Sequence, residues 1–178
     1  MKDYKSVSHP KEFPASVTAV IEIPMNSGIV KYEICSDGFL HVDRFLPVSM
    51  NYPCNYGFIP NTLGGDGDPL DILVISRQPI AQTALVKVKP VAVLLMEDEK
   101  GPDEKVVAVP TQSVDLFYAN ISDQNDLPEI QKLQIKHFFE RYKDLENGKF
   151  VKINGWADAL HAQKIITKGF ELSKEKIK

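Results

Sequence analysis

The spacing of apolar residues changes partway along the chain, and this change constrains the fold more than any other feature. Through the first two thirds, apolar residues either alternate with polar ones or form short runs, which is typical of strands. The predicted strands are Val17–Ile23, Ile29–Ile34, Phe39–Leu46, 71–76, 84–96 and 105–110. The last third has helical spacing instead. Strands followed by two helices predict an α+β fold in which helices cover a sheet or small barrel.

Two helices are predicted in the final third. The first begins at Asp126, an N-cap with Glu129 three residues later in a capping-box pattern, and stops near Gly148. Its apolar stripe is Ile130, Leu133, Phe138, Tyr142 and Leu145. The second helix is predicted over Asp158–Leu172. Its apolar stripe is Ala162, Ile165, Ile166, Gly169 and Phe170.

The bulk properties favour a cytoplasmic protein made of one domain, residues 1–178. The formal net charge is −3, which argues against a protein that mainly binds nucleic acid. No run of about 18 apolar residues predicts a membrane span, and the polar N-terminus does not resemble a signal peptide. Cys35 and Cys54 form no CxxC pair and are too few for a disulfide scaffold, which fits a reducing compartment.

The stretch GGDGDPLDILV places Asp66, Asp68 and Asp71 within six residues. Carboxylates so close together repel one another unless a cation neutralises them, and hard divalent metal ions bind such oxygens. The alternative is a solvated surface turn. An EF-hand is excluded, because its sixth and twelfth positions need Gly and Glu, and counting from Asp66 they hold Asp71 and Arg77.

Other charged and phenolic residues could join this group if the fold brings them together. Each has a simpler interpretation: a solvated loop for Asp98 and Asp103, a solvent-facing strand for Lys31 and Glu33, a structural ion pair for Arg44, or ordinary packing for tyrosines. The remaining candidates are Glu22, Tyr52, Tyr56, Tyr142 and Lys143. Carboxylates collect divalent metals, and Lys, Arg and Tyr bind phosphate oxygens. With no nucleotide-binding glycine loop or protein nucleophile motif, this set suits a small polyanion attacked by water made reactive by metal.

The motif DGDPLD, Asp66–Asp71, resembles the signature of the soluble, metal-dependent inorganic pyrophosphatases. The segments VIEIP, KYEI, VDRF, YPCNYGFIP, LLMEDEKGPDEKVVAVP and HFFERYKDLENGKFVKINGW follow in the family's order, from Val17 to Phe170. The resemblance implies a small antiparallel OB-like β-barrel with two C-terminal helices packed against it. It also implies hydrolysis of pyrophosphate to two phosphates, with Mg²⁺ as the activator and Mn²⁺ or Zn²⁺ as alternative metals.

The resemblance also implies a role for each matching position. Asp68 matches the aspartate that acts on the attacking water, and Tyr56 matches a tyrosine near it that also contacts substrate. The matches to ligands of the tightest metals are Asp66, Asp71 and Asp103, and those to acids beside the substrate's metals are Asp98 and Glu22. The matches to phosphate-binding groups are Lys31, Arg44, Lys105, Tyr142 and Lys143. Glu33 and Tyr52 match residues that support the site from behind.

Two departures from the family pattern concern the surroundings of the site and the assembly. The turn at Ser36–Gly38 is one residue shorter than in some relatives, and Arg141 stands where some bacterial relatives have a second histidine, four residues after His137. Bacterial members resemble hexamers, so a homohexamer is expected. The alternatives are an OB-like module for single-stranded nucleic acid, which the acidic balance opposes, and a structural protein stabilised by Ca²⁺.

Overall fold

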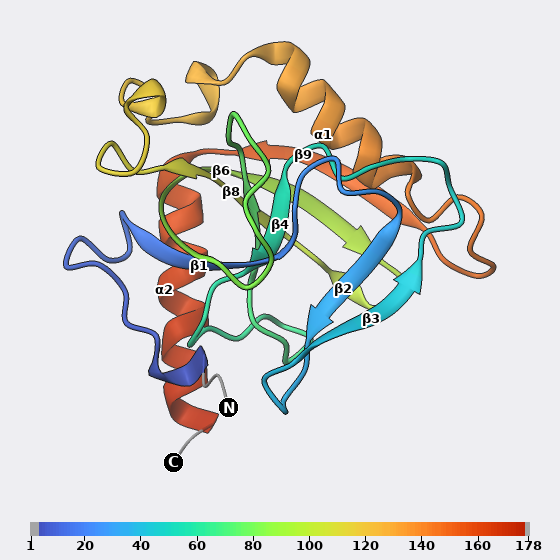
Figure 1. Cartoon of the computed structure of the whole chain (residues 1–178), viewed down its shortest axis with the longest axis horizontal. Coiled ribbons are helices and arrows are strands. Elements are labelled where there is room, and N and C mark those ends of the chain that lie inside the picture. Colours follow the sequence, from blue (N-terminus) through green and yellow to red (C-terminus); the bar gives the residue numbers. More distant parts are fainter. Residues whose placement is uncertain (1–3, 177–178) are drawn as a thin grey trace.

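The computed structural model describes residues 4–176 and has the α+β architecture that the sequence predicts (Figure 1). The helices are α1 (Glu129–Arg141) and α2 (Ala159–Lys176), with 3₁₀ turns η1 (Tyr4–Ser6), η2 (Leu116–Tyr118) and η3 (Gln124–Asp126). The strands are β1 (Val17–Ile23), β2 (Val30–Ile34), β3 (Leu40–Phe45), β4 (Asn55–Phe58), β5 (Asp71–Val74), β6 (Leu85–Asp98), β7 (Gly101–Pro102), β8 (Lys105–Pro110) and β9 (Val151–Ala157).

Five strands close into a small barrel. β1 pairs with β4, β4 with β5, β5 with β8 and β8 with β6, and β6 pairs back onto β1. The long strand β6 makes this closure possible, because it pairs with both β1 and β8, and its C-terminal half also pairs with β9 outside the barrel. β2 and β3 form a separate hairpin, as the SDG turn predicts, and this hairpin projects beside the barrel in Figure 1.

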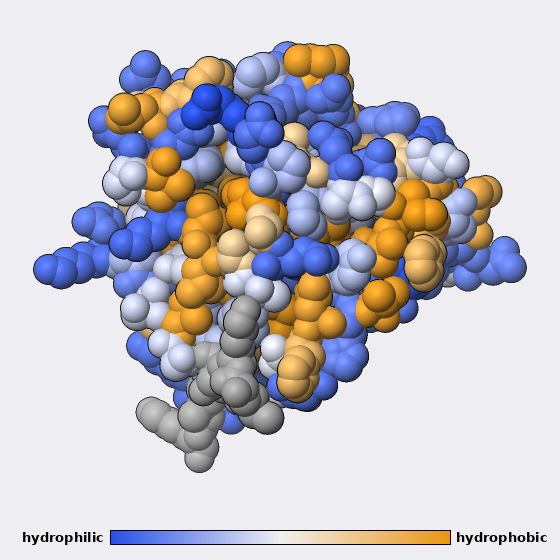
Figure 2. Space-filling model, viewed as in Figure 1, coloured by the Kyte–Doolittle hydropathy of each residue, from blue (hydrophilic) through white to orange (hydrophobic). Residues whose placement is uncertain are grey.

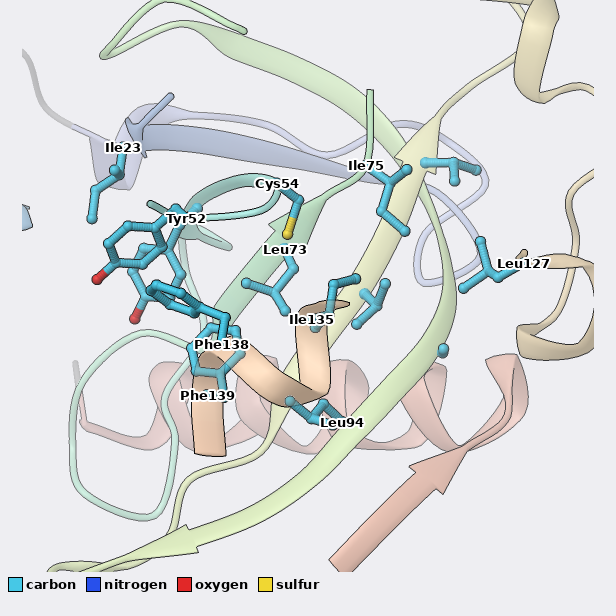
Figure 3. Packing of buried hydrophobic residues seen from close by; sticks show 14 of the residues in the cluster. Ile23, Tyr52, Cys54, Leu73, Ile75, Leu94, Leu127, Ile135, Phe138 and Phe139 are labelled. Carbon is cyan, nitrogen blue, oxygen red and sulfur yellow. The ribbon is translucent and has the colours of Figure 1, made fainter. Parts of the chain in front are cut away.

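The central strands are buried on both faces, which explains why their sequences are continuous apolar runs. Along β5, Ile72 and Val74 contribute to one hydrophobic cluster while Leu73 contributes to the other. The first cluster includes Ala162 and Ile166 of α2. The second includes residues of α1, and Figure 3 shows their aromatic rings beside Leu73. Each helix therefore covers one of the two hydrophobic clusters.

The first helix differs from its prediction at both ends. Asp126 does not cap α1; it ends η3, where Asp123 is the N-cap and the two residues form a capping box. Pro128 then precedes α1, and the helix stops at Arg141 rather than near Gly148, giving way to turns. The predicted stripe is also partly wrong. Ile130, Leu133 and Leu145 are at least half exposed, and the buried residues of the helix are Ile135, Phe138 and Phe139.

The second helix agrees better with its prediction, with Ala162, Ile166 and Gly169 buried. Three strands, however, were not predicted. They are β4, which contains Tyr56, the two-residue strand β7, and β9, which lies between the two helices. β5 and β8 run parallel, so the barrel is not purely antiparallel. Within residues 4–176, neither helix has the length and apolarity needed to cross a membrane.

Candidate active site

One cavity of about 280 Å³ collects the predicted site residues at one end of the barrel. All of them line it except Tyr52. Eight carboxylates and six cationic side chains share its wall. The lining residues are Glu22, Lys31, Glu33, Ile34, Arg44, Tyr56, Phe58, Asp66, Asp68, Pro69, Asp71, Asp98, Glu99, Lys100, Pro102, Asp103, Lys105, Tyr142, Lys143 and Lys149. The cavity is therefore rich in both signs of charge.

The aspartate loop is held by its own hydrogen bonds. The backbone N–H of Asp68 donates to Asp66 Oδ1 over 3.1 Å, and the N–H of Gly64 donates to the Asp68 carbonyl over 2.7 Å. Gly67 has a φ of +89°, a conformation that side chains other than glycine rarely adopt. Partial burial and the charge of Asp66 raise the pKa of Asp68. The loop thus presents Asp66 and Asp68 to the same cavity.

Lys105 lies between two of the predicted metal ligands. Its ammonium forms ion pairs with Asp71 and Asp103, and its side chain is almost fully buried. Burial alone would lower the pKa of Lys105, but the two carboxylates outweigh burial and raise it. Asp71 opens β5 and Lys105 opens β8, the adjacent parallel strand. Lys105 therefore supplies part of the neutralisation that the clustered aspartates require.

Glu22 is a buried carboxylate on β1, only 6% exposed. Its Oε1 accepts a hydrogen bond from the N–H of Ile34 over 2.7 Å, which ties β1 to the β2–β3 hairpin. Burial raises the pKa of Glu22 to about 8, and the nearby charges of Asp71 and Glu33 act in the same direction. The carboxyl of Glu22 therefore keeps its proton near neutral pH, even though the charge of Lys31 acts to lower its pKa.

The hairpin brings two cations to the cavity, and carboxylates hold both. Asp43 Oδ2 accepts hydrogen bonds from Lys31 Nζ over 2.9 Å and from Arg44 Nη1 over 2.6 Å. Lys31 also pairs with Glu33, and Arg44 Nε donates to Glu146 over 3.3 Å. Burial alone would lower the pKa of Lys31, but Glu33 and Asp43 outweigh it and raise that pKa.

The charged loop between β6 and β8 meets the end of α1. Lys143 Nζ donates to Asp98 Oδ2 over 2.7 Å and to Glu99 Oε2 over 3.1 Å. Burial works to raise the pKa of Asp98, but the hydrogen bonds from Lys143 and from the backbone of Lys100 outweigh it and lower that pKa. This loop lines the cavity, and Asp98 and Asp103 form ion pairs there instead of being solvated.

Three tyrosines lie near or at the cavity. Tyr56 and Tyr142 line it, whereas Tyr52 is only 2% exposed and lies behind them. Its ring centroid is 5.4 Å from that of Tyr56 and 4.7 Å from that of Phe138, and Figure 3 shows Tyr52 beside Phe138. Burial raises the pKa of all three phenols, so they remain neutral hydrogen-bond donors.

Several lining residues were not predicted. The charged ones are Glu99, Lys100 and Lys149, and the others are Ile34, Phe58, Pro69 and Pro102. Glu99 and Lys100 adjoin Asp98, so the whole charged loop could have been included once Asp98 was. Lys149 follows a predicted helix stop at Gly148, and nothing in the sequence pattern places that turn against the cavity.

The donor chemistry of the cavity fits hard divalent cations, which bind six or more oxygen ligands, preferably carboxylates. Asp66, Asp68, Asp71 and Asp103 share the cavity wall. Among residues 4–176, no three His, Cys, Asp or Glu side chains already stand in a metal-binding arrangement. In this structure, Lys105 pairs with Asp71 and Asp103 instead.

Comparison with known proteins gives consistent matches. Residues 19–174 match the family model described as inorganic pyrophosphatase. A curated protein from Rickettsia prowazekii named inorganic pyrophosphatase is 50% identical over 156 residues, covering 87% of this chain and 91% of the relative. One of the same name from Aeropyrum pernix is 55% identical over 161 residues, covering 90% and 91%.

Solved structures agree with the sequence matches. An enzyme from Anaplasma phagocytophilum, described as an inorganic phosphatase, superposes with a TM-score of 0.92 at 48% identity, covering 95% of this chain and 99% of the other. The inorganic pyrophosphatase of Thermus thermophilus has a TM-score of 0.92 at 44% identity, covering 97% and 99%. The likeness therefore extends over nearly the whole of both chains.

Proposed function

The chain belongs to the inorganic pyrophosphatase family of enzymes, and from this premise we propose that it hydrolyses pyrophosphate to two phosphates at the cavity at the end of the barrel. The observation that carries the proposal is the meeting of eight carboxylates and six cationic side chains in one small cavity. Carboxylates suit metal ions, and cations suit the oxygens of a phosphoric anhydride. The family matches favour this reaction over the nucleic-acid alternative.

Asp66, Asp71 and Asp103 would hold the tightest divalent ions, and Asp98 and Glu22 would help to hold those that accompany the substrate. When bound, the ions neutralise negative charge and make a nearby water more acidic. We propose Mg²⁺ as the natural ion, with Mn²⁺ or Zn²⁺ able to replace it. Glu22 is buried near the charges of Asp71 and Glu33, which raise its pKa, and a bound cation would favour its ionised form.

Asp68 is proposed to accept the proton of the attacking water. Its position between Asp66 and Asp71 in the sequence, on a loop held by internal hydrogen bonds, supports this role. Its raised pKa makes Asp68 a stronger base than an isolated aspartate. Tyr56, a neutral donor on the cavity wall, is proposed to orient the water or a substrate oxygen beside it.

Four of the cationic side chains, together with Tyr142, are proposed to bind the phosphate oxygens. Arg44 and Lys31 approach from the hairpin, and Lys143 and Lys105 approach from the other sides of the cavity. Positive groups fixed around the leaving phosphate stabilise the charge that develops on it as the P–O bond breaks. Glu33 and Tyr52 would support these groups, as the pairing of Glu33 with Lys31 suggests.

The assembly and setting of the enzyme are also proposals. We propose a homo-oligomer, most simply a hexamer, and the large exposed apolar side chains support it. Ile130 and Leu133 of α1 are 64% and 50% exposed, and Figure 2 shows apolar groups among polar ones over α1 and over the β2–β3 hairpin. Cys35 and Cys54 are free, which supports a reducing, cytoplasmic setting.

The proposal is tested by phosphate release from pyrophosphate, with Mg²⁺ and then with excess chelator. We expect release that the chelator abolishes. Asp68→Asn should lower kcat by about a hundredfold or more, the usual contribution of a general base, without changing the fold. Asp37→Asn is the matched control, since Asp37 lies outside the cavity and pairs with His41. If the kcat of Asp68→Asn stays within tenfold of the wild-type value, the role assigned to Asp68 is wrong.

Thermal stabilisation by Ca²⁺ without any hydrolysis would favour the structural alternative.

A further inference from the structure

Glu146 connects two cationic side chains of the cavity wall. One oxygen, Oε1, accepts a hydrogen bond from Arg44 Nε over 3.3 Å, and the other, Oε2, pairs with Lys149 Nζ over 2.6 Å. Arg44 comes from β3, whereas Glu146 and Lys149 belong to the turns that follow α1. A single carboxylate therefore joins the hairpin to the segment between α1 and β9, 102 residues further along the chain.

Glu146 lies behind these cations rather than in front of them. Arg44 and Lys149 both line the cavity, whereas Glu146 is not among the residues that line it in the described part of the chain. Its side chain is 13% exposed, less than that of Arg44 at 27% or Lys149 at 34%. Glu146 therefore holds two groups that line the cavity without lining it itself.

The donors that Arg44 retains indicate what it is positioned for. Nε is held by Glu146 and Nη1 by Asp43, so two of the three guanidinium nitrogens are anchored, and the hydrogens of Nη2 take no part in either bond. Lys149 Nζ likewise has one anchor, Glu146, and an ammonium has three hydrogens to donate. Both side chains keep donors for an anion while they are held in place.

We propose that Glu146 is a positioning residue that holds Arg44 and Lys149 in place to bind phosphate oxygens, and that Lys149 is a further substrate-binding residue. The inference rests on the proposed function, because it assigns these groups to the same pyrophosphate. Holding two long side chains in advance lowers the conformational entropy that substrate binding must otherwise cost. Glu146 therefore favours binding of an anion even though it is itself negative.

The charge of Glu146 and its anchoring contacts have opposite effects on anion binding, so a substitution can separate them. Removing the negative charge of Glu146 leaves the cavity more positive, which alone would tighten the binding of an anion and lower KM. Removing the anchor frees Arg44 and Lys149, which weakens binding and raises KM. A merely structural or charge-balancing role predicts no change or a decrease, whereas a positioning role predicts an increase.

The experiment compares the whole enzyme with its Glu146→Gln, Asp144→Asn and Lys149→Met variants at saturating Mg²⁺. Asp144→Asn is the matched control: it removes the same charge two residues away, from an exposed side chain that pairs with Arg141 rather than with a cation of the cavity. We expect Glu146→Gln to raise KM about tenfold, comparable to losing one charge-assisted hydrogen bond, with kcat changed less than KM. Asp144→Asn should leave both constants unchanged.

Two further measurements complete the test: the energetic coupling between Glu146 and Lys149, and the direct binding of a substrate analogue. If Glu146 acts through Lys149, the double variant should raise KM by less than the product of the two single effects. Binding of methylenediphosphonate, a pyrophosphate analogue that is not hydrolysed, should weaken in parallel by calorimetry. Thermal unfolding shows whether each variant is folded. An unchanged or lower KM and an unchanged analogue affinity in folded Glu146→Gln would overturn the inference. Absence of hydrolysis by the wild type would instead refute the proposed function, and analogue binding would still decide the role of Glu146.

Discussion

Glu22→Gln should make the metal-free protein more stable, and by an amount that grows with pH. Glu22 is 6% exposed, and its pKa rises from 4.5 to about 8 in the folded protein. Glutamine has nearly the same shape and can still accept the hydrogen bond from the N–H of Ile34. It carries no charge to desolvate, so it removes the titration and keeps most of the packing.

The sign and size of this stability difference follow from proton linkage. Because the folded pKa is higher, the folded state keeps a proton that the unfolded state releases, so wild-type stability falls as pH rises through this window. The window extends from 4.5 to about 8. At about 1.4 kcal/mol per pH unit, wild type should lose up to about 5 kcal/mol relative to Glu22→Gln, an upper limit because nearby carboxylates titrate together with Glu22.

The assay is urea unfolding in chelator, at one protein concentration and at about pH 5, 7 and 9. The gap in the free energy of unfolding between variant and wild type should widen at each step and narrow again when Mg²⁺ is added, since a cation favours the ionised carboxylate. Parallel pH profiles for the two proteins would refute the reasoning, because they would mean that Glu22 does not titrate in this range.

Two further predictions concern the barrel itself. Gly57→Ala should destabilise the protein by about 3 kcal/mol or more, because the added Cβ would lie 1.8 Å from the Val20 carbonyl oxygen and would push β1 away from β4; urea unfolding measures the loss, and a change below about 1 kcal/mol would contradict it. Asn55→Ala should cost about 2–5 kcal/mol, because the N–H groups of Met25 and Ile80 lose their acceptor; hydrogen exchange should show these two amides losing protection.

Alternating and continuous apolar segments predicted four of the five barrel strands, because a strand buried against a core has a local signature, but β4 was missed. Val17–Ile23 was predicted with its observed bounds. The first helix was less predictable. Asp126 has the residue type and spacing of an N-cap, but the chain uses that pattern for η3 instead. The exposure of Ile130 and Leu133 depends on which side of α1 meets the barrel, and helical spacing alone does not decide this between competing apolar stripes.

Site residues could be predicted from the sequence where a charged residue stands in a place that would destabilise an ordinary fold. Clustered aspartates and the lone Glu22 among apolar residues are costly in an ordinary fold, so their presence predicts a function. Glu146 and Lys149 gave no such signal, because a charged turn after a helix is ordinary on a surface. Their importance depends on a contact with Arg44 across 102 residues of chain, which only the three-dimensional structure reveals.

The parallel pairing of β5 with β8 also has a consequence for the order of folding. Parallel strands cannot be joined by a tight turn, so the chain must make the long excursion through β6 before β8 can pair with β5. Asp71 and Lys105 open these two strands and meet 34 residues apart. A chain that has formed β5 but not yet β8 would carry its aspartates without the ammonium that compensates them. The Lys105 ammonium therefore reaches Asp71 only once β8 has paired with β5, so the charge balance of the aspartate loop depends on closure of the barrel.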